Sequence, residues 1–210
     1  MSELTIRYHG HSCFTLIYNG FRTVLDPYSD GSVPGLKPLR ITADACFCSH
    51  THGDHNGSSS VTLFEPGKEP PFTVQTLSVP HDGQNGALRG MNLIHKFTFN
   101  DLTVVHFGDL GRKLTDEEAE QLSEADCVLI PVGGYFTISA AEAKQIISQI
   151  RPKVVIPMHY RTETSGYDVI GTLQDFLQFC KSYEKTGSEY TLTKQDKEIV
   201  LVMKGTNEGE

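Results

Sequence analysis

Short hydrophobic runs alternate with polar turn residues through the first hundred positions of the chain. The runs are rich in β-branched and aromatic residues, a pattern that predicts β-strands at 4–8, 13–18, 21–25, 72–79, 92–99 and 102–107. Asn19-Gly20 and Asn100-Asp101 separate neighbouring runs and favour tight hairpin turns. Residues 27–42 carry three prolines and two glycines, which predicts a long loop.

Helical spacing takes over in the second half. Thr115 and Ser139 each precede a glutamate by three residues, the capping-box pattern that opens a helix. We expect the first helix to end near Ser123 and the second just before Pro152. A third helix is predicted with Asp168 as its cap, because apolar residues recur at 173, 176, 177 and 180. Buried strands are predicted at 127–132, 153–158 and 198–203, and a frayed polar tail at 206–210.

Strands come first and helices interleave with strands later, which is typical of a layered α/β protein. The 210 residues suit one domain, with halves at about 1–100 and 101–210. Hydrophobic residues make up 38% of the chain, enough for a core without disulfide staples. The five cysteines are scattered and odd in number, so we expect reduced thiols in a cytoplasmic protein. Cys46 and Cys48 alternate on one strand, but a single Cys-x-Cys pair is weak evidence for a metal site.

The net charge of -8 argues against broad nucleic-acid binding, which depends on lysine and arginine. It leaves room for a small anionic substrate held by a local positive site. The first residues lack an apolar signal segment, and no uncharged apolar run reaches the roughly 18 residues of a membrane helix. We therefore expect no membrane partner, and these patterns do not indicate an oligomeric state.

The densest group of metal-binding residues lies between positions 49 and 56, in the sequence SHTHGDHN. It contains His50, His52, Asp54 and His55, and it follows the short apolar run 45–48. An extended backbone places His50 and His52 on one face, and the intervening glycine lets Asp54 and His55 aim at a second point nearby. Zinc takes three or four such ligands at roughly 2.0–2.3 Å. A polar loop without a ligand is the weaker interpretation, since loop histidines rarely gather around a carboxylate at this spacing.

Three further metal-binding residues follow apolar runs elsewhere in the chain and precede loops: His81, Asp109 and His159. Rigid strands fix the side chains at their ends, and functional groups tend to collect there. Each residue alone could equally be a strand-end polar group or a helix cap. Together they predict that the chain assembles one metal site from several strand ends.

The order of these residues resembles the metallo-β-lactamase superfamily. The likeness covers the His-x-His-x-Asp-His stretch, the later single histidine, the Gly-Asp pair, the final histidine and an early Leu25-Asp26-Pro27, and it extends over about residues 5–203. The resemblance implies a four-layer αβ/βα sandwich with the site at one edge, between the two halves. Three motifs are similar to the branch that includes ascorbate-6-phosphate lactonase: Gly10-His-Ser12, Pro131-Val-Gly-Gly134 with Thr137, and Pro157-Met-His-Tyr160.

The resemblance also implies a site for two zinc ions per chain, with manganese as the other candidate. One ion would be held by His50, His52 and His81, the other by Asp54, His55 and His159, and Asp109 would bridge the two. A hydroxide between the ions would attack the substrate. Asp54 would orient this nucleophile or accept its proton, and His11 would act on the substrate. Leu110, where many relatives have threonine, and the short interval from His55 to His81 leave the substrate open.

Several residues near the predicted ligands have two interpretations. Asp26 either holds a ligand histidine through its second ring nitrogen or simply turns the strand into Pro27. Tyr135 and Phe136 either form an apolar wall of the pocket or belong to the core. Four cations follow ligands within a few residues and either hold an anionic group or are solvated: Arg89, Arg112, Lys113 and Arg161. Three histidines are expected to be ordinary strand residues with satisfied or exposed rings: His9, His95 and His106.

These observations predict a hydrolase that uses a metal-bridging hydroxide on a small ester, lactone or phosphoester. A phosphodiesterase or nuclease on the same fold is the alternative enzyme, which the acidic charge and the short His55–His81 interval disfavour. A metal-binding or sensing module without catalysis is the alternative outside enzymes, and retention of the full ligand set argues against it. The expected partner is a small molecule that can be anionic.

Overall fold

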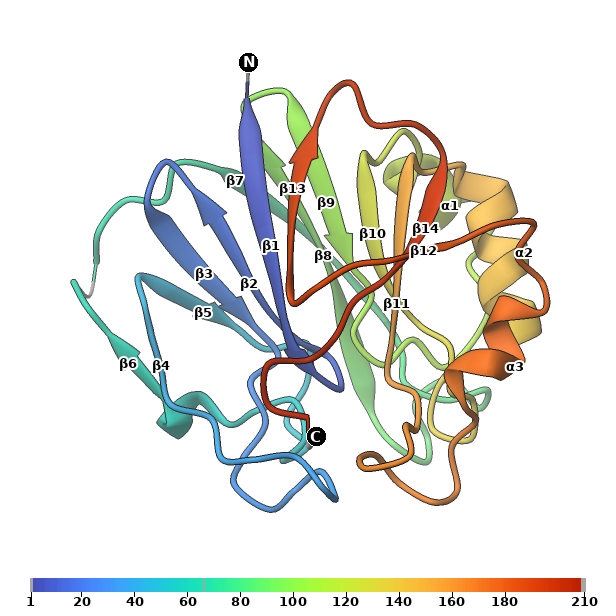
Figure 1. Ribbon diagram of the computed structural model, residues 1–210. Coiled ribbons are helices and arrows are strands. Elements are labelled where there is room, and N and C mark those ends of the chain that lie inside the picture. The colour runs from blue at the N-terminus through green and yellow to red at the C-terminus, as the bar shows by residue number, and fades with distance from the viewer. Residues whose placement is uncertain (1, 66, 209–210) are drawn as a thin grey trace.

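Two β-sheets packed face to face form the centre of the molecule (Figure 1). The computed structural model describes residues 2–65 and 67–208. The first sheet has five strands, all antiparallel to their neighbours except for the last pair. In spatial order these strands are β13 (Glu189–Thr193), β1 (Glu3–Gly10), β2 (Cys13–Tyr18), β3 (Phe21–Leu25) and β5 (Ala45–Phe47).

The second sheet is larger and mostly parallel. In spatial order its seven strands are β12 (Glu184–Lys185), β14 (Ile199–Val202), β11 (Val154–Met158), β10 (Cys127–Pro131), β9 (Leu102–His106), β8 (Met91–Phe99) and β7 (Thr73–Pro80). Only β8 runs against its neighbours β9 and β7. A separate pair, β4 (Ile41–Ala43) and β6 (Val61–Leu63), lies beside the first sheet, with a short 3₁₀ helix η1 (Ser58–Ser60) before β6.

The three α-helices lie on the outer side of the seven-stranded sheet (Figure 1). They are α1 (Asp116–Leu122), α2 (Ala140–Ile150) and α3 (Leu173–Leu177). Both predicted capping boxes are confirmed, at Thr115 and at Ser139. The predicted cap of the third helix is wrong, because α3 begins after Thr172, whose backbone N–H and hydroxyl both donate to the Asp175 carboxylate. Asp168 lies in the preceding loop, and the helix ends before Cys180.

The predicted layered α/β fold is confirmed, but its outer layers are unequal. On the outer face of the five-stranded sheet, the proline-rich loop replaces a helix layer. Its residues Tyr28, Val33 and Leu39 form a second small core with Cys13 and Val24 of the sheet. The main core lies between the two sheets and under the helices.

Local patterns missed elements that depend on distant partners. Strand β13 was not predicted, because only Leu192 of its five residues is buried, and its place is fixed by pairing with β1. The prediction of a frayed tail is also wrong for residues 206–208. The backbone N–H of Thr206 donates to the carbonyl of Tyr8 at 3.1 Å, and the Asn207 side chain donates to the Tyr28 hydroxyl at 2.9 Å. The rest of that tail, residues 209–210, lies outside the described residues.

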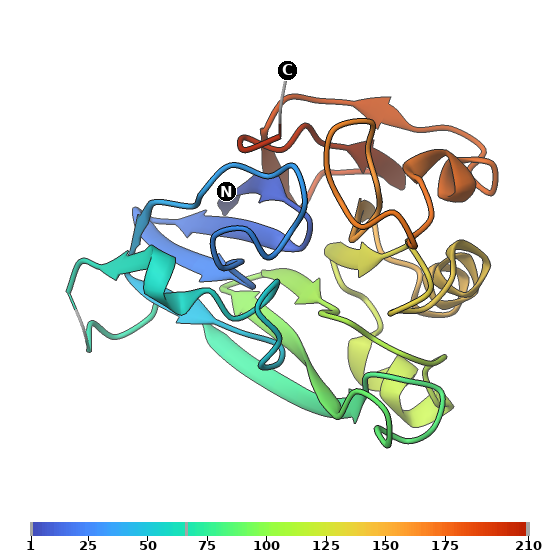
Figure 2. The same cartoon turned by 90° about the horizontal axis from the view of Figure 1, so that it is seen from below.

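Strand direction brings the important loops to one edge. β1, β3 and β5 run parallel to one another, so their carboxyl ends share an edge of the first sheet. The same holds for β7, β9, β10 and β11 in the second sheet. The two edges meet where the backbone N–H of His159 donates to the carbonyl of His11 at 2.9 Å. Figure 2 views the molecule from this side. Among the described residues, no helix is long and apolar enough to cross a membrane.

Candidate metal centre

The shared edge gathers all seven predicted ligands from both sheets. The loop after β5 carries His50, His52, Asp54 and His55, and three other strand ends supply the rest: His81 after β7, Asp109 after β9 and His159 after β11. Their nitrogen and oxygen atoms fall into overlapping groups in which all candidate ligand atoms lie within 4.8 Å of one another. The structure therefore brings together what the spacing of the sequence predicted, while metal binding itself stays a prediction.

One group consists of His50, His52 and His81. The His50 and His81 rings lie 4.5 Å apart between centroids, and His52 lies 4.7 Å from His50. His52 is exposed, whereas His81 is buried. This group therefore lies at the opening of the site, where solvent or substrate can approach.

A second group consists of His11, Asp54, His55 and His159. His11, predicted only to act on the substrate, joins the three predicted ligands because its ring centroid lies 4.1 Å from that of His159. Its Nε2 lies 3.2 Å from the Asp54 carboxylate. Both His11 and His159 have positive φ angles, 55° and 54°, which non-glycine residues adopt at a cost and mostly at functional sites.

Asp109 lies between these two groups, and with His50 and His55 it forms a third group that overlaps both. Its carboxylate is 3.1 Å from Nε2 of His55 and 3.3 Å from Nε2 of His159. Nε2 of His81 lies at 3.4 Å and Nε2 of His50 at 4.0 Å. A carboxylate facing four imidazole nitrogens from both groups has the position expected of a ligand shared by two ions.

Several candidate donor atoms of this cluster make no hydrogen bond within the described residues, which tests whether a metal fits. Ten buried side-chain nitrogen or oxygen atoms of the described residues have no hydrogen bond, and seven belong to the cluster. Leaving such an atom unpaired costs about 1–3 kcal/mol. Imidazole nitrogens and carboxylate oxygens are the donors that zinc and related ions take. The seven atoms are His11 Nδ1, His50 Nε2, His55 Nε2, His81 Nδ1, Asp109 Oδ1 and both ring nitrogens of His159.

Hydrogen bonds behind the cluster fix the tautomers of two histidines. The Asp26 carboxylate can only accept, so His55 donates from Nδ1 at 2.7 Å, and this contact directs Nε2 toward Asp109. The Ser49 hydroxyl donates to Asp26 at 2.6 Å and therefore accepts from Nδ1 of His50 at 2.9 Å. Asp26 thus holds His55, one of the predicted ligands, through its second ring nitrogen, in line with the first interpretation.

The pKa values of His50 and His11 suit ligation at neutral pH. Burial and the nearby His55 lower the pKa of His50 to about 3, and burial with His159 lowers that of His11 to about 4. Both rings are therefore neutral, the form that binds metals. Burial also disfavours charge on His55, but the carboxylates of Asp109 and Asp26 outweigh it and raise its pKa well above the ordinary value. A bound cation would take the place of that proton.

The loop that carries Asp109 is held by contacts that the sequence did not reveal. Asn92 of β8 accepts from the backbone N–H of Asp109 at 2.7 Å and donates to the carbonyl of Phe107 at 2.9 Å. Gly108 has a φ of 53°, and a Cβ there would lie 2.3 Å from the Asn92 side chain and 2.4 Å from that of Ser49. Only glycine fits this position, which accounts for the Gly-Asp pair.

Asp82, directly after His81, organises the loop at the mouth of the site. It is 2% exposed, and its carboxylate accepts from four backbone N–H groups, those of Gln84, Gly86, Leu88 and Arg89, at 2.7–3.0 Å. The loop thus has its shape from one side chain rather than from a helix or strand.

Replacing Asp82 with alanine should release this loop. Bonds to a charged acceptor contribute about 1.5–3 kcal/mol each, so the four amide protons should exchange with solvent at least about tenfold faster. Hydrogen exchange followed by NMR would measure this. Asp101→Ala, at an exposed hairpin, is the control and should leave the rates unchanged. Unchanged exchange in the Asp82 variant would show that the loop does not depend on the carboxylate.

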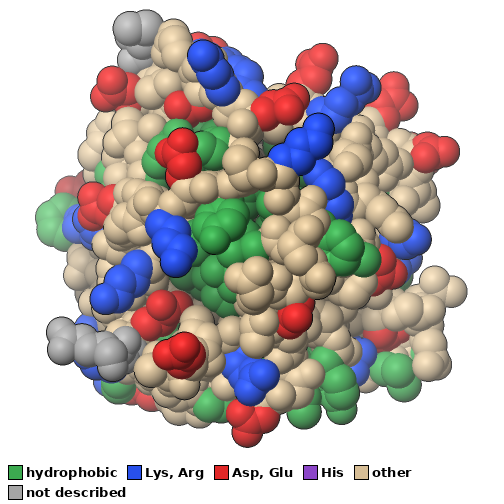
Figure 3. All heavy atoms as spheres, turned by 45° about the vertical axis from the view of Figure 1, so that its right-hand side comes forward, with side chains coloured by type: hydrophobic (Ala, Val, Ile, Leu, Met, Phe, Trp, Pro, Cys, Tyr) green, Lys and Arg blue, Asp and Glu red, His purple; other side chains and the backbone are tan. Residues whose placement is uncertain are grey.

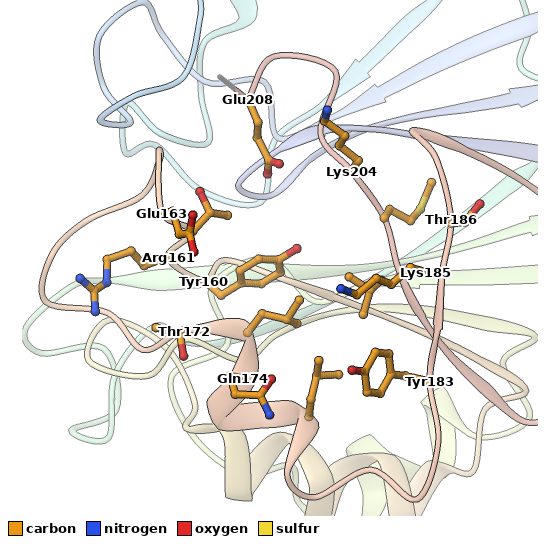
Figure 4. A pocket seen from close by; sticks show the side chains of 15 residues that line it. Tyr160, Arg161, Glu163, Thr172, Gln174, Tyr183, Lys185, Thr186, Lys204 and Glu208 are labelled. Atoms are coloured by element: carbon orange, nitrogen blue, oxygen red, sulfur yellow. The ribbon is translucent and has the colours of Figure 1, made fainter. Parts of the chain in front are cut away.

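The four candidate cations differ in their surroundings. Arg112 forms two hydrogen bonds of 2.7 Å with Glu118 and is not free for a substrate. Lys113 is exposed. Arg161 lines a separate cleft of about 650 Å³, whose lining residues include none of the predicted ligands, and its guanidinium points away from the cleft centre (Figure 4). Figure 3 shows this cleft as a hydrophobic hollow in the surface, over α3, β12 and β14. Arg89 stays a candidate for the mouth, with its guanidinium 5.4 Å from the Phe136 ring centre.

The remaining histidines are ordinary, as predicted. The ring of His9 contacts Thr206 and Thr15, that of His95 contacts Thr76 and the Cys48 carbonyl, and that of His106 contacts the Ser12 carbonyl and the Gly108 N–H. Their nitrogens have partners within the protein. Within the described residues, no candidate metal group includes a cysteine.

Comparisons with known proteins point to one superfamily. The family model described as "Beta-lactamase superfamily domain" matches residues 5–159. UPF0173 metal-dependent hydrolases from Staphylothermus marinus and Thermoplasma acidophilum are each 29% identical, over 76% and 77% of this chain and 84% and 85% of theirs. A crystal structure from Thermotoga maritima, assigned as a zinc-dependent hydrolase of the metallo-beta-lactamase superfamily, is 31% identical. It covers 95% of this chain and 98% of its own, with a TM-score of 0.76.

Proposed function

Because the chain belongs to the metallo-β-lactamase superfamily, we propose that it is a metal-dependent hydrolase of a small ester, lactone or phosphoester. The observation that carries this proposal is the convergence of four histidine Nε2 atoms on the Asp109 carboxylate, at 3.1–4.0 Å, in a cluster with seven unpaired buried atoms at a partly open edge. The names of the UPF0173 relatives and of the Thermotoga maritima protein support metal-dependent hydrolysis. The lactonase-like branch stays part of the proposal, since it rests on the sequence motifs alone.

Two ions fit the donor set. His50, His52 and His81 would hold one, Asp54, His55 and His159 the other, and Asp109 would contact both. The excess of imidazole over carboxylate favours zinc, and manganese is the alternative. Bound divalent ions lower the pKa of water toward 7 and polarise the carbonyl or phosphoryl group under attack.

The protein's own groups would orient the attacking water. The Asp54 side chain is 15% exposed, and one of its oxygens contacts Nε2 of His11. The carboxylate is therefore fixed in direction while it still reaches solvent at the mouth. A water that donates a hydrogen bond to Asp54 would approach the substrate from a defined side, which is the orienting role predicted for this residue.

The test is a metal-reconstitution assay. Metal-free protein is loaded with zinc or manganese and offered 4-nitrophenyl acetate, dihydrocoumarin and bis-4-nitrophenyl phosphate, to represent an ester, a lactone and a phosphodiester. We expect turnover that a chelator abolishes and added metal restores. His81→Ala should lose it, and His95→Ala, whose ring lies outside the metal groups, should keep it.

The outcomes separate the candidate functions. Turnover of the phosphodiester alone would favour the phosphodiesterase alternative. Stoichiometric metal uptake without turnover of any substrate would favour a metal-binding module. Absence of metal uptake would contradict the proposal as a whole.

A further inference from the structure

A row of aromatic rings leads from the metal cluster to the surface. Tyr167 stands edge-on to His11 at 5.8 Å between centroids, and Phe136 lies 5.6 Å beyond Tyr167. Tyr135 continues the row at 4.8 Å from Phe136. The Tyr167 hydroxyl donates to the Ser32 carbonyl at 2.7 Å, which anchors the inner ring. We call Tyr135, Phe136 and Tyr167 the aromatic row.

The outer end of the row is held in a costly position. Tyr135 is 65% exposed and has a φ of 59°, in the left-handed region that non-glycine residues adopt only at a cost. The turn that carries it is tied to the site, because the N–H of Ile138 donates to the carbonyl of Leu110, next to Asp109, at 2.8 Å. An exposed ring gives folding little in return for the strain, so its value lies in what it contacts outside the chain.

Arg89 covers Phe136 from another direction. Its guanidinium lies 5.4 Å from the ring centre, and its backbone is fixed by Asp82 at 2.8 Å. Among the described residues no carboxylate pairs with Arg89, unlike Arg112, which is neutralised by Glu118. A guanidinium that packs near an aromatic ring keeps its N–H donors free for an anion, and the ring restricts the motion of the arginine side chain.

We propose that the aromatic row and Arg89 form a specificity pocket for substrates with a flat apolar group and a distal anion. The flat group would lie along Tyr167 and Phe136, the carboxylate or phosphate would meet Arg89, and the scissile bond would lie at the metal cluster. Hydrolysis there adds water across that bond and leaves the distal anion untouched. This inference rests on the proposed function, since it names the substrate class of that same site.

The test compares two esters that differ in one group. Phenyl acetate lacks a distal charge, whereas 4-acetoxybenzoate carries a carboxylate on the far side of the ring. We expect the wild-type, metal-loaded protein to show a KM about tenfold lower for 4-acetoxybenzoate with similar kcat, because the added contact is equal in ground and transition state. Arg89→Gln should remove this preference, and Arg89→Lys should keep part of it.

Two further variants test the contact with the aromatic ring and the effect of losing any positive charge near the site. Phe136→Leu should raise KM for both esters. Lys113→Gln removes an exposed positive charge without touching the row and should leave the preference unchanged. An equal preference in wild type and Arg89→Gln, or the same loss in Lys113→Gln, would overturn the pocket while leaving the hydrolase intact.

A binding measurement keeps the inference testable if neither ester is turned over. Saturation-transfer NMR on metal-free protein would compare phenol with 4-hydroxybenzoate. We expect contact with 4-hydroxybenzoate that exceeds that with phenol and is lost in Arg89→Gln. Equal signals for the two compounds would contradict the pocket, independently of whether the protein hydrolyses esters.

Discussion

Replacing Asp109 with asparagine should empty the metal site and remove activity. Its carboxylate lies 3.1–4.0 Å from nitrogens of four histidines, which is the position proposed for a ligand shared by two ions. Loss of an outer partner of a metal ligand already costs 10–100-fold in affinity. We therefore expect metal affinity to fall roughly a hundredfold or more, and kcat/KM by roughly a thousandfold.

Metal content after equilibrium dialysis, measured by mass spectrometry, would check this prediction together with the kinetics. The metal-free variant should stay folded, because asparagine has nearly the same shape as aspartate. Asp101→Asn is the matched control, since it removes a carboxylate from an exposed turn and should leave two ions bound. Two tightly bound ions in Asp109→Asn would contradict the central position of this residue.

The sequence predicted strands where short runs of hydrophobic residues mark buried segments. The runs at 102–107 and 127–132 correspond closely to β9 and β10. β10 is buried along its whole length, and β9 is buried at every residue but Thr103. β13 escaped prediction because pairing with β1 fixes its place. That partner lies more than 180 residues away, and no local pattern records it.

The same division applies to the site. The ligand candidates were visible because histidine and aspartate at strand ends are rare enough to stand out, whereas their supports are common residues. Ser49 connects Asp26 to His50, and Asn92 holds the loop of Asp109, yet neither differs locally from any other serine or asparagine. Such contacts exist only once the chain has folded.

Spacing in the sequence also failed to show which of the candidate cations is free to bind an anion. Arg89 and Arg112 each follow a predicted ligand within eight residues. In the structure Glu118 neutralises Arg112. Arg89 instead packs against the uncharged Phe136 ring, so its positive charge can still meet an anion. Tyr167, eight residues after His159, gave no sequence signal because a loop returns it to His11.

Replacing Asp26 with alanine should destabilise the whole fold as well as the site. Asp26 is fully buried and accepts from the Ser49 N–H, the Ser49 hydroxyl and Nδ1 of His55. Without it three buried donors lose their acceptor, each at a cost of about 1–3 kcal/mol. We therefore expect the free energy of unfolding, measured in urea, to fall by about 3–5 kcal/mol. Asp26→Asn keeps one oxygen and should lose about half as much.

The control for Asp26 is another buried carboxylate outside the metal cluster. Asp44 accepts from the backbone N–H of Arg22 at 2.8 Å, and Asp44→Ala should destabilise the metal-free protein by about 1–3 kcal/mol. Its metal affinity should be unchanged, whereas Asp26→Ala should bind metal 10–100-fold more weakly, because His55 loses the partner that fixes its tautomer. If both variants lost stability but kept full metal affinity, Asp26 would support the fold alone, and the bond to His55 would not orient a ligand.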